Sequence, residues 1–315
     1  MARFTGGLST DGVLFSSKPL HETNMTAHFR TIGIIGKYVA PGVQRTLRQL
    51  LDFLRQRGCE VIGDHYTADS YPDLHVSRLD WESFGARADL AMVVGGDGTM
   101  LYAARHLASH HTPLLGINLG RLGFLTDVSP DSMEATLKSI LDGEYERDER
   151  LTLELQLLEN DEIVQRGFAL NDVVVHKWDM ARMIELETHV NGRFVDTLRS
   201  DGLIIATPTG STGYALSGGG PLMPPNIDAW VLAPICPHTL SNRPIVLRSD
   251  SRMEIRIHGR TEPRHVRISC DGNDSLPIGE NTLIRIVQGP HPVRLIHPRG
   301  HDHFCLLRAK LGWGG

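Results

Sequence analysis

The sequence predicts an α/β domain followed by a mostly antiparallel β domain. In the first half, short apolar runs such as 32–35 and 90–94 alternate with helical patterns. Apolar strands that alternate with helices are typical of a parallel sheet covered by helices on both faces, a Rossmann-like arrangement. Near residue 150 the apolar period changes from 3.6 to 2, because leucines occupy every second position from Leu151 to Leu157. This alternation indicates strands with one face in a core.

The elements of the first half follow from apolar spacing. We expect strands at residues 32–35, 61–62, 90–94 and 114–117. We expect helices on the apolar positions of 43–54, 100–107 and 133–141. The last of these helices should begin directly after Ser129, an N-cap residue followed by a proline.

The second half contains turn signals between alternating runs. Asn160-Asp161 predicts a turn, and Asn191-Gly192 after the run 184–190 is the strongest short hairpin signal. Further alternating runs lie at 253–257, 266–270 and 293–295. We therefore expect a mobile tail over 1–30, the α/β domain over 31–148, the β-rich domain over 149–290, and a C-terminal segment over 291–315 that packs back on the first domain.

Composition and charge exclude several classes of protein. The chain has 315 residues, 41% of them hydrophobic, which excludes disorder for most of its length. A net charge of -5 provides no basic surface for nucleic acid or an anionic membrane. No apolar run approaches the ~18 residues of a membrane helix, and no signal peptide is visible. Four scattered cysteines suggest neither a disulfide framework nor a zinc site. We expect a cytoplasmic protein without nucleic-acid or membrane partners.

Glycine is locally enriched. The chain has 32 glycines in 315 residues, about 10%, against a usual share of about 7%. Twelve of them lie in two windows, residues 95–123 and 201–221. Clustered glycines let the backbone turn sharply or let a ligand approach it closely. Because one window lies in each half, we expect a site where the two domains meet.

The first window opens on a motif that directly follows the strand 90–94, Gly95-Gly96-Asp97-Gly98-Thr99. Ligands bind at this edge of a parallel sheet, and the glycines leave the backbone N–H groups open to a phosphate. Asp97 has two readings: it caps the following helix, or it faces a hydroxyl and a polyphosphate, as a general base or through Mg²⁺. The chain contains neither a Walker A loop nor a GxGxxG fingerprint.

The second window concentrates small hydroxyl residues and glycines after a predicted strand, in the run 207–214. A solvated loop needs no such concentration. A nucleotide-binding loop uses the hydroxyls as donors to phosphate and ribose oxygens.

The GGDGT element resembles one shared by NAD kinases, diacylglycerol and sphingosine kinases, and phosphofructokinases. The rest of the chain distinguishes among them, because five segments closely resemble the bacterial NAD kinase family, in order and at family spacing. These segments are Leu115–Leu125, Leu170–Val173, Asp201–Pro221, Pro234–Pro244 and Leu306–Trp313. The resemblance runs from about residue 32 to residue 313.

The resemblance implies ATP- and Mg²⁺-dependent phosphorylation of the 2′-hydroxyl on the adenosine ribose of NAD, giving NADP. Asp97 is then the base or orienting group for that hydroxyl. The family's Asn-Glu pair, which binds adenosine, is here Asn171-Asp172, with a carboxylate one methylene shorter. Read without the resemblance, Asn171-Asp172 would be a β-turn between two strands.

The resemblance also implies the other site residues. Phe124 lines the adenine pocket, Asp201 reaches the nicotinamide end, and His238 comes from a neighbouring subunit of a homodimer or homotetramer. The remaining NAD contacts are Gly98, Thr212, Gly213, Tyr214 and Ser217. For the phosphates of ATP we expect Gly95, Gly96 and Thr99, with Arg199 as the first basic candidate and Arg121 and Arg243 next. Mg²⁺ would be held mainly by the ATP phosphates.

Two alternative functions and one candidate metal motif compete with this interpretation. A lipid kinase of the diacylglycerol type shares GGDGT but not the segments of the second half. A non-catalytic dinucleotide sensor would keep the pocket without turnover. The histidines of His301-Asp302-His303 could share one face of a strand, but a third ligand is not apparent, so we expect a surface cluster there.

Overall fold

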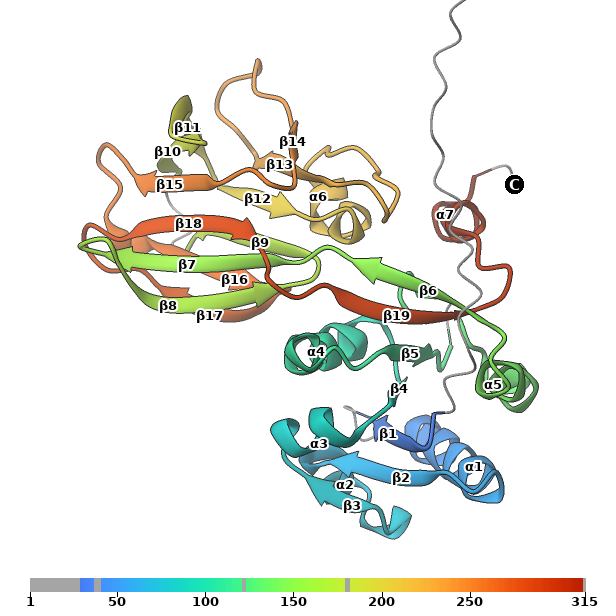
Figure 1. Cartoon of the computed structure of the whole chain (residues 1–315). Coiled ribbons are helices and arrows are strands. Elements are labelled where there is room, and N and C mark those ends of the chain that lie inside the picture. The colour runs from blue at the N-terminus through green and yellow to red at the C-terminus, as the bar shows by residue number, and fades with distance from the viewer. Residues whose placement is uncertain (1–28, 37–40, 121–122, 179–181, 314–315) are drawn as a thin grey trace, which may run out of the picture.

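The computed structural model describes residues 29–36, 41–120, 123–178 and 182–313. The tail expected over 1–30 therefore lies almost wholly outside the described residues, as does Arg121. Three sheets organise the chain (Figure 1). In the described residues no helix is both long and apolar enough to cross a membrane.

The first sheet has seven strands in the order β3-β2-β1-β4-β5-β19-β6. Its strands are β1 (Thr31–Ile35), β2 (Glu60–Asp64), β3 (Ser77–Leu79), β4 (Leu90–Val94), β5 (Leu114–Ile117), β6 (Tyr145–Arg150) and β19 (Val293–Pro298). All neighbours are parallel except β6, which runs antiparallel to β19. The parallel sheet of the first half is confirmed, and β19 brings the end of the chain back into it.

Helices cover both faces of this sheet. On one face α1 (Pro41–Gln56) and α5 (Met133–Leu141) pack on the side chains of β1, β4 and β5. On the other face lie α3 (Trp81–Arg87) and α4 (Asp97–Leu107), while α2 (His65–Ser70) follows β2. The alternation of β-strand side chains explains the two clusters, since Ile34 faces the first and Ile35 the second. The expected helix after Ser129 begins later, because Ser129 caps a 3₁₀ turn, Pro130–Ser132, before α5.

The second and third sheets are antiparallel and pack face to face. One contains β7 (Leu153–Glu159), β8 (Glu162–Ala169), β10 (Ile184–Val190), β11 (Arg193–Ser200), β15 (Met253–Ile257) and β18 (Leu283–Gln288). The other contains β9 (Asp172–Lys177), β12 (Gly202–Ala206), β13 (Ala229–Ile235), β14 (Ile245–Arg248), β16 (Val266–Cys270) and β17 (Asn273–Pro277). Their core includes the fully buried Trp230. The hairpin at Asn191-Gly192 is confirmed, with φ of 52° and 76° at its two turn residues.

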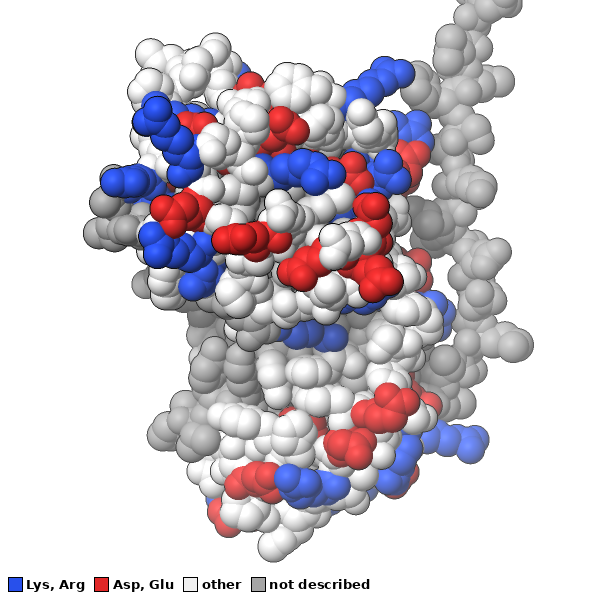
Figure 2. Space-filling view, turned by 90° about the vertical axis from the view of Figure 1, so that its left-hand side faces the viewer, with Lys and Arg blue, Asp and Glu red and all other residues white. Residues whose placement is uncertain are grey.

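Two further helices, α6 and α7, complete the fold. The helix α6 (Tyr214–Ser217) follows β12 and packs on the outer face of the third sheet. The helix α7 (His303–Leu311) follows β19. Between the parts, α4 packs towards Leu170, and Arg105 of α4 donates to the carbonyl oxygen of Cys270 (2.8 Å). Acidic and basic side chains are interspersed on the face drawn in Figure 2.

Candidate active site

Asp97 is the first residue of α4 and its carboxylate is held by a separate loop. The helix N-cap is Gly96, which has an extended backbone, φ −103° and ψ −171°. The Oδ2 atom of Asp97 accepts a hydrogen bond from the backbone N–H of Phe124, and Oδ1 accepts one from Leu125, both at 3.0 Å. The helix-capping reading of Asp97 is therefore wrong, because its side chain bonds the loop after β5 and not its own helix.

Gly123 lets this loop approach the carboxylate. A Cβ atom on Gly123 would lie 2.2 Å from Asp97 Oδ1 and 2.2 Å from Thr126 Oγ1, far inside van der Waals contact. By contrast, a Cβ on Gly96 or Gly98 would meet nothing within 4 Å. The backbone at the start of α4 therefore borders open space, whereas the space beside Gly123 is filled by the side chain of Asp97.

The hydroxyl-rich loop after β12 forms a 3₁₀ turn, Thr209–Thr212, that is bonded within itself. The hydroxyl of Thr207 donates to the carbonyl of Leu170 (2.6 Å), and that of Ser211 to the carbonyl of Pro208 (2.6 Å). The hydroxyl of Thr212 donates to the carbonyl of Thr209 (3.2 Å). In this structure these hydroxyls therefore donate to backbone carbonyls and fix the loop, and their expected contacts with a ligand stay a prediction.

This loop and the start of β9 are in close contact. The carbonyl of Asn171 accepts the N–H of Thr207 (2.9 Å), and a Cβ on Gly210 would lie 2.1 Å from the Asn171 oxygen. The side-chain oxygen of Asn171 is buried and has no hydrogen-bond partner among the described residues. Asp172 begins β9, so the β-turn reading of the pair is not what the structure shows. An unsatisfied buried acceptor beside a cavity is a place where a ligand donor can bind.

A cavity of about 520 Å³ opens beside the start of β9. Its lining includes four residues expected from the sequence, namely Asn171, Asp172, Asp201 and Tyr214. The rest of the lining is Val174, His176, Lys177, Ile235, Ser269, Asp271 and Gly272. The side chain of Tyr214 is exposed at the start of α6. The structure thus brings together the residues expected at the adenosine and nicotinamide ends.

The cavity is strongly acidic at one end. Burial, together with the negative charge of Asp271, raises the pKa of Asp172 to about 7. Burial also raises the pKa of Asp271, although three backbone N–H groups, those of residues 170–172, donate to its carboxylate and oppose that effect. Perturbed carboxyl groups in a cavity are typical of functional sites.

Asp201, expected at the nicotinamide end, forms an ion pair inside the cavity. Its Oδ1 lies 2.7 Å from Nζ of Lys177, and both side chains are about one quarter exposed, at 27% and 24%. Among the described residues, Lys177 is the one lysine or arginine in the lining of the acidic cavity. Lys177 ends β9 and Asp201 precedes β12, so the antiparallel pairing of these two strands brings the two side chains together.

Several expected site residues do not line this cavity. Arg199 is exposed on β11, and its carbonyl accepts the N–H of His238 (2.9 Å). Arg243 donates to the carbonyls of Leu240 and Asn242. The other expected NAD contacts flank Tyr214 in the chain: Thr212 and Gly213 lie at the end of the 3₁₀ turn, and Ser217 ends α6. Phe124 is half-buried beside Asp97, and Nζ of Lys310 lies 5.5 Å from the centroid of its ring.

Sequence reasoning missed three charged residues at the site. Lys177 and Asp271 line the cavity, and Lys310 covers the ring of Phe124. Asp271-Gly272 has the sequence signature of a hairpin turn, and both residues do have positive φ, 53° and 68°. Nothing in that signature shows that the carboxylate of Asp271 turns back onto the start of β9.

The two halves of the chain match known protein families. The family model described as ATP-NAD kinase N-terminal domain matches residues 32–145, and the model described as ATP-NAD kinase C-terminal domain matches residues 170–298. The NAD kinase of Nitrosococcus oceani is 47% identical over 291 residues, which cover 92% of this chain and 99% of that protein. The NAD kinase of Nitrosomonas europaea is 46% identical over 290 residues, covering 92% and 97%.

Solved structures share the fold. An NAD kinase from Archaeoglobus fulgidus in complex with ATP is 28% identical, with a TM-score of 0.69 over 90% of this chain and 100% of that one. A yeast NADH kinase complexed with NADH is 24% identical, with a TM-score of 0.81 over 92% and 89%. With both domain models matched and curated relatives above 45% identity over almost the whole length, this chain belongs to the ATP-NAD kinase family.

Proposed function

We propose that this chain transfers the γ-phosphoryl group of ATP to the 2′-hydroxyl on the adenosine ribose of NAD, giving NADP. The observation that carries the proposal is the position of the Asp97 carboxylate. Asp97 begins α4, and its carboxylate is fixed by two backbone N–H groups of the loop after β5. Leu125, whose N–H holds this carboxylate, belongs to the same core cluster as Leu170, the residue directly before Asn171. A base beside a nucleoside-binding cavity is what phosphorylation of a ribose hydroxyl requires.

The phosphates of ATP would bind where α4 begins. Open space beside Gly96 and Gly98 lets phosphate oxygens reach the backbone there, and a helix N-terminus favours negative charge. Gly95 and Thr99 complete the turn, with the hydroxyl of Thr99 buried and without a hydrogen-bond partner among the described residues. Mg²⁺, held mainly by the ATP phosphates, would neutralise charge on the transferred group. The hard carboxylate oxygens of Asp97 fit a second role as its ligands.

Asp97 would orient the 2′-hydroxyl and accept its proton. Each carboxylate oxygen accepts one N–H group in this structure and keeps a further lone pair for a hydroxyl. The two N–H groups come from a loop that also bears Phe124, the residue proposed to contact adenine. Binding of adenine to Phe124 would therefore set the position of the loop and of the Asp97 carboxylate together. The 2′-hydroxyl and this carboxylate would then lie within hydrogen-bond distance of each other.

NAD would occupy the cavity beside β9. The unpartnered oxygen of Asn171 and the carboxyl of Asp172, with a pKa of about 7, offer acceptors and a donor for the ribose hydroxyls and adenine. Asp201 and Lys177 lie in the same cavity for the other half of the dinucleotide. Thr212, Gly213, Tyr214 and Ser217 would contact NAD from the loop side once it is bound.

We propose a homodimer or homotetramer in which His238 completes the site of a neighbouring subunit. His238 is exposed and does not line the cavity of its own chain. Apolar side chains near it are also exposed, namely Leu240 (90%), Ile245 (42%) and Val246 (52%). Exposed apolar side chains in one region are typical of protein–protein interfaces.

The four cysteines are free thiols, which fits the reducing cytoplasm.

The decisive experiment compares the chain with an Asp97→Asn variant in a spectroscopic assay of NADP formation from NAD, ATP and Mg²⁺. We expect the variant to fold and to lose about 10²–10⁴ of the turnover, the usual contribution of a general base. Asp131→Asn, an exposed carboxylate at another helix start, should keep full activity. Wild-type turnover in Asp97→Asn would refute the role of Asp97. Tight NADP binding without any turnover in the wild-type chain would refute the kinase activity.

A further inference from the structure

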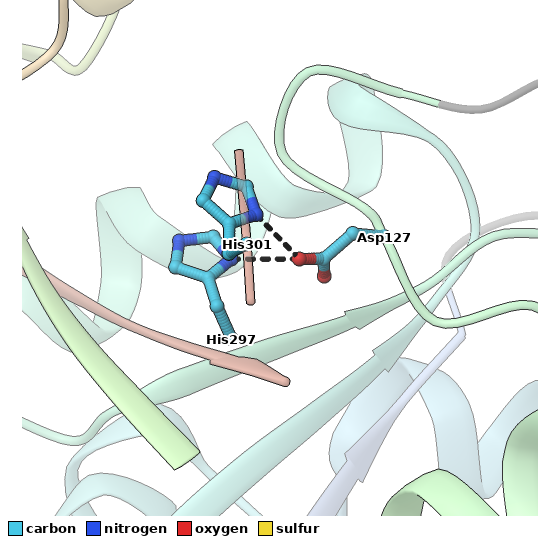
Figure 3. A group of neighbouring side chains, drawn as sticks. All are labelled: Asp127, His297 and His301. Carbon is cyan, nitrogen blue, oxygen red and sulfur yellow. Dashed lines mark hydrogen bonds and ion pairs between the residues drawn. The ribbon is translucent and has the colours of Figure 1, made fainter. Parts of the chain in front are cut away.

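Asp127, His297 and His301 converge at one point between the loop after β5 and the C-terminal segment (Figure 3). The Oδ2 atom of Asp127 lies 2.9 Å from Nδ1 of His297 and 3.0 Å from Nδ1 of His301. The two imidazole rings are stacked, with centroids 3.8 Å apart and planes 19° apart. The prediction of a surface cluster at His301 is therefore wrong, because the His301 side chain faces inward. The other two members of its group are His297 and Asp127, and Asp127 is remote in sequence.

This cluster is buried yet incompletely bonded. The side chains of His297, Asp127 and His301 are only 3%, 12% and 12% exposed. Even so, Oδ1 of Asp127 and Nε2 of both histidines have no hydrogen-bond partner among the described residues. Buried polar atoms are normally bonded, so this cluster is short of hydrogen-bond partners, although Nε2 of His297 has a carboxylate oxygen of Asp148 at 3.4 Å.

We propose that Asp127, His297 and His301 bind a divalent transition-metal ion of the zinc type. Two imidazoles and one carboxylate form a donor set that suits Zn²⁺, with a water in the fourth tetrahedral position. At metal–ligand bonds of about 2.0–2.1 Å, tetrahedral donors stand about 3.3 Å apart. The two N···O distances of 2.9 and 3.0 Å would therefore widen by only a few tenths of an ångström. The ion would replace the ring protons that now lie between these atoms.

A supporting carboxylate is already present. Nε2 of His297, the nitrogen that faces away from Asp127, lies 3.4 Å from Oδ2 of Asp148. Asp148 is in turn held by Nε of Arg150 at 2.6 Å. Histidines that bind a metal usually donate their other ring N–H to a carboxylate, which fixes the ring and strengthens the ligand. Metal at Nδ1 of His297 would leave Nε2–H to donate to Asp148.

The position of the site gives the ion a structural role. Asp127 lies two residues after Leu125, whose N–H holds the carboxylate of Asp97. His297 belongs to β19, and His301 lies on the connection to α7, the helix that places Lys310 over Phe124. A metal ion here would fasten the loop that holds Asp97 to the C-terminal segment. It is separate from the magnesium that accompanies ATP and does not depend on the proposed reaction.

The test is metal binding by the full chain, freed of any affinity tag and of metal, with Zn²⁺ alone as the probe. In competition with a chromophoric chelator, we expect one tightly bound equivalent per chain. His301→Gln should weaken that binding at least tenfold, and Asp148→Asn by about 10–100-fold, as for other supporting carboxylates. His303→Gln, two residues away on α7, is the matched control and should bind like the wild type. Bound Co²⁺ should give the visible absorption of a four-coordinate site, lost in His301→Gln.

Two outcomes would overturn the proposal. One is the absence of zinc uptake by the wild-type chain. The other is uptake that His301→Gln leaves unchanged, which would assign the metal to other histidines among the 16 in the sequence. Circular dichroism of the metal-free variants establishes that they fold. If His301→Gln does not fold, Asp127→Asn provides the same comparison, because it keeps the shape of the side chain and removes its charge.

Discussion

The backbone N–H of Asp172 donates a hydrogen bond to the carboxylate of Asp271 at 3.1 Å, so two buried acidic residues lie side by side at the edge of the cavity. Their roles differ. Asp271 accepts three backbone N–H groups and fixes the start of β9. Asp172, 6% exposed, has a pKa raised to about 7 by burial and by the charge of Asp271. The fold thus keeps a carboxyl group at a position where its ionisation is unfavourable, which is typical of a ligand-binding residue.

Asp172→Asn should stabilise the protein, and more so as the pH rises. The pKa of Asp172 is about 7 in the folded state against a model value of 3.8. The folded state therefore binds more protons between these values, and the free energy of unfolding falls as the pH rises through that window. At pH 8 the variant should be more stable than the wild type by on the order of 2–4 kcal/mol, and near pH 4 the two should be equal. Urea unfolding at a series of pH values measures this difference.

Asp52→Asn on α1 provides the control, because Asp52 is exposed and should give the wild-type pH profile. A pH profile of Asp172→Asn that parallels the wild type would show that Asp172 is ionised without cost. In that event its part in binding ribose hydroxyls would have to rest on a permanently charged carboxylate.

Gly123→Ala should lower turnover without removing any functional group. The new Cβ would lie 2.2 Å from Oδ1 of Asp97, so either the carboxylate or the loop must move. A displacement near 1 Å at a reacting group can cost about 10²-fold in rate. We expect kcat to fall by about that factor and the far-ultraviolet circular dichroism to stay unchanged, as steady-state kinetics and spectroscopy would measure.

Gly120→Ala is the matched control in the same loop, since a Cβ on Gly120 would meet nothing within 4 Å. It should keep wild-type kinetics. Equal losses in both variants would mean that the loop is sensitive to any added side chain, and the specific contact between Gly123 and Asp97 would lose its support.

The sequence predicts the long elements of this fold and misses the short and remote ones. The apolar spacing of α1 and α4 and the turn at Asn191-Gly192 are local signals, and the structure confirms them. Between β2 and β4, however, the three-residue strand β3 and the helices α2 and α3 are too short for a detectable period. The sequence does predict that the segment 291–315 packs back on the first domain, but the position of β19 beside β5 depends on pairing over almost two hundred residues of chain, which no local pattern records.

The residues of the two candidate sites divide in the same way, into those that a sequence motif marks and those that only the fold brings together. Asp97 and the pair Asn171-Asp172 are predicted as site residues because motifs carry them. Asp271 and Asp127 were missed because their roles depend on which backbone or ring the fold brings next to them. The sequence does not show that the hydroxyls of the loop after β12 bond their own backbone, because a residue type that can bind a ligand can equally do this.

Lys177→Met should weaken NAD binding more than it slows catalysis. It removes the cation that lies 2.7 Å from Asp201 and leaves an acidic cavity with no lysine or arginine among the described residues of its lining. A dinucleotide with two phosphates should then bind less well, so we expect KM for NAD to rise about tenfold, equivalent to about 1.4 kcal/mol, with little change in kcat. Lys138→Met, an exposed lysine on α5, is the control. A fall in kcat with KM unchanged would place Lys177 in the chemical step.

Leu170→Ala should both destabilise the protein and loosen its active site. Leu170 is fully buried in the cluster that joins Leu125, beside Asp97, to the start of β9. Truncating a buried leucine typically costs 2–5 kcal/mol, the larger values arising where the cavity cannot collapse. Because Leu170 packs in a cluster shared with the first sheet and its helices, the space it leaves should persist, and we expect a loss of about 3–4 kcal/mol in urea unfolding. Ile163→Ala, on the exposed face of β8, should change stability by less than about 0.5 kcal/mol. If Leu170→Ala lost stability but kept the wild-type KM and kcat, the packing between the two layers would hold the fold together without positioning Asp97 relative to Asn171.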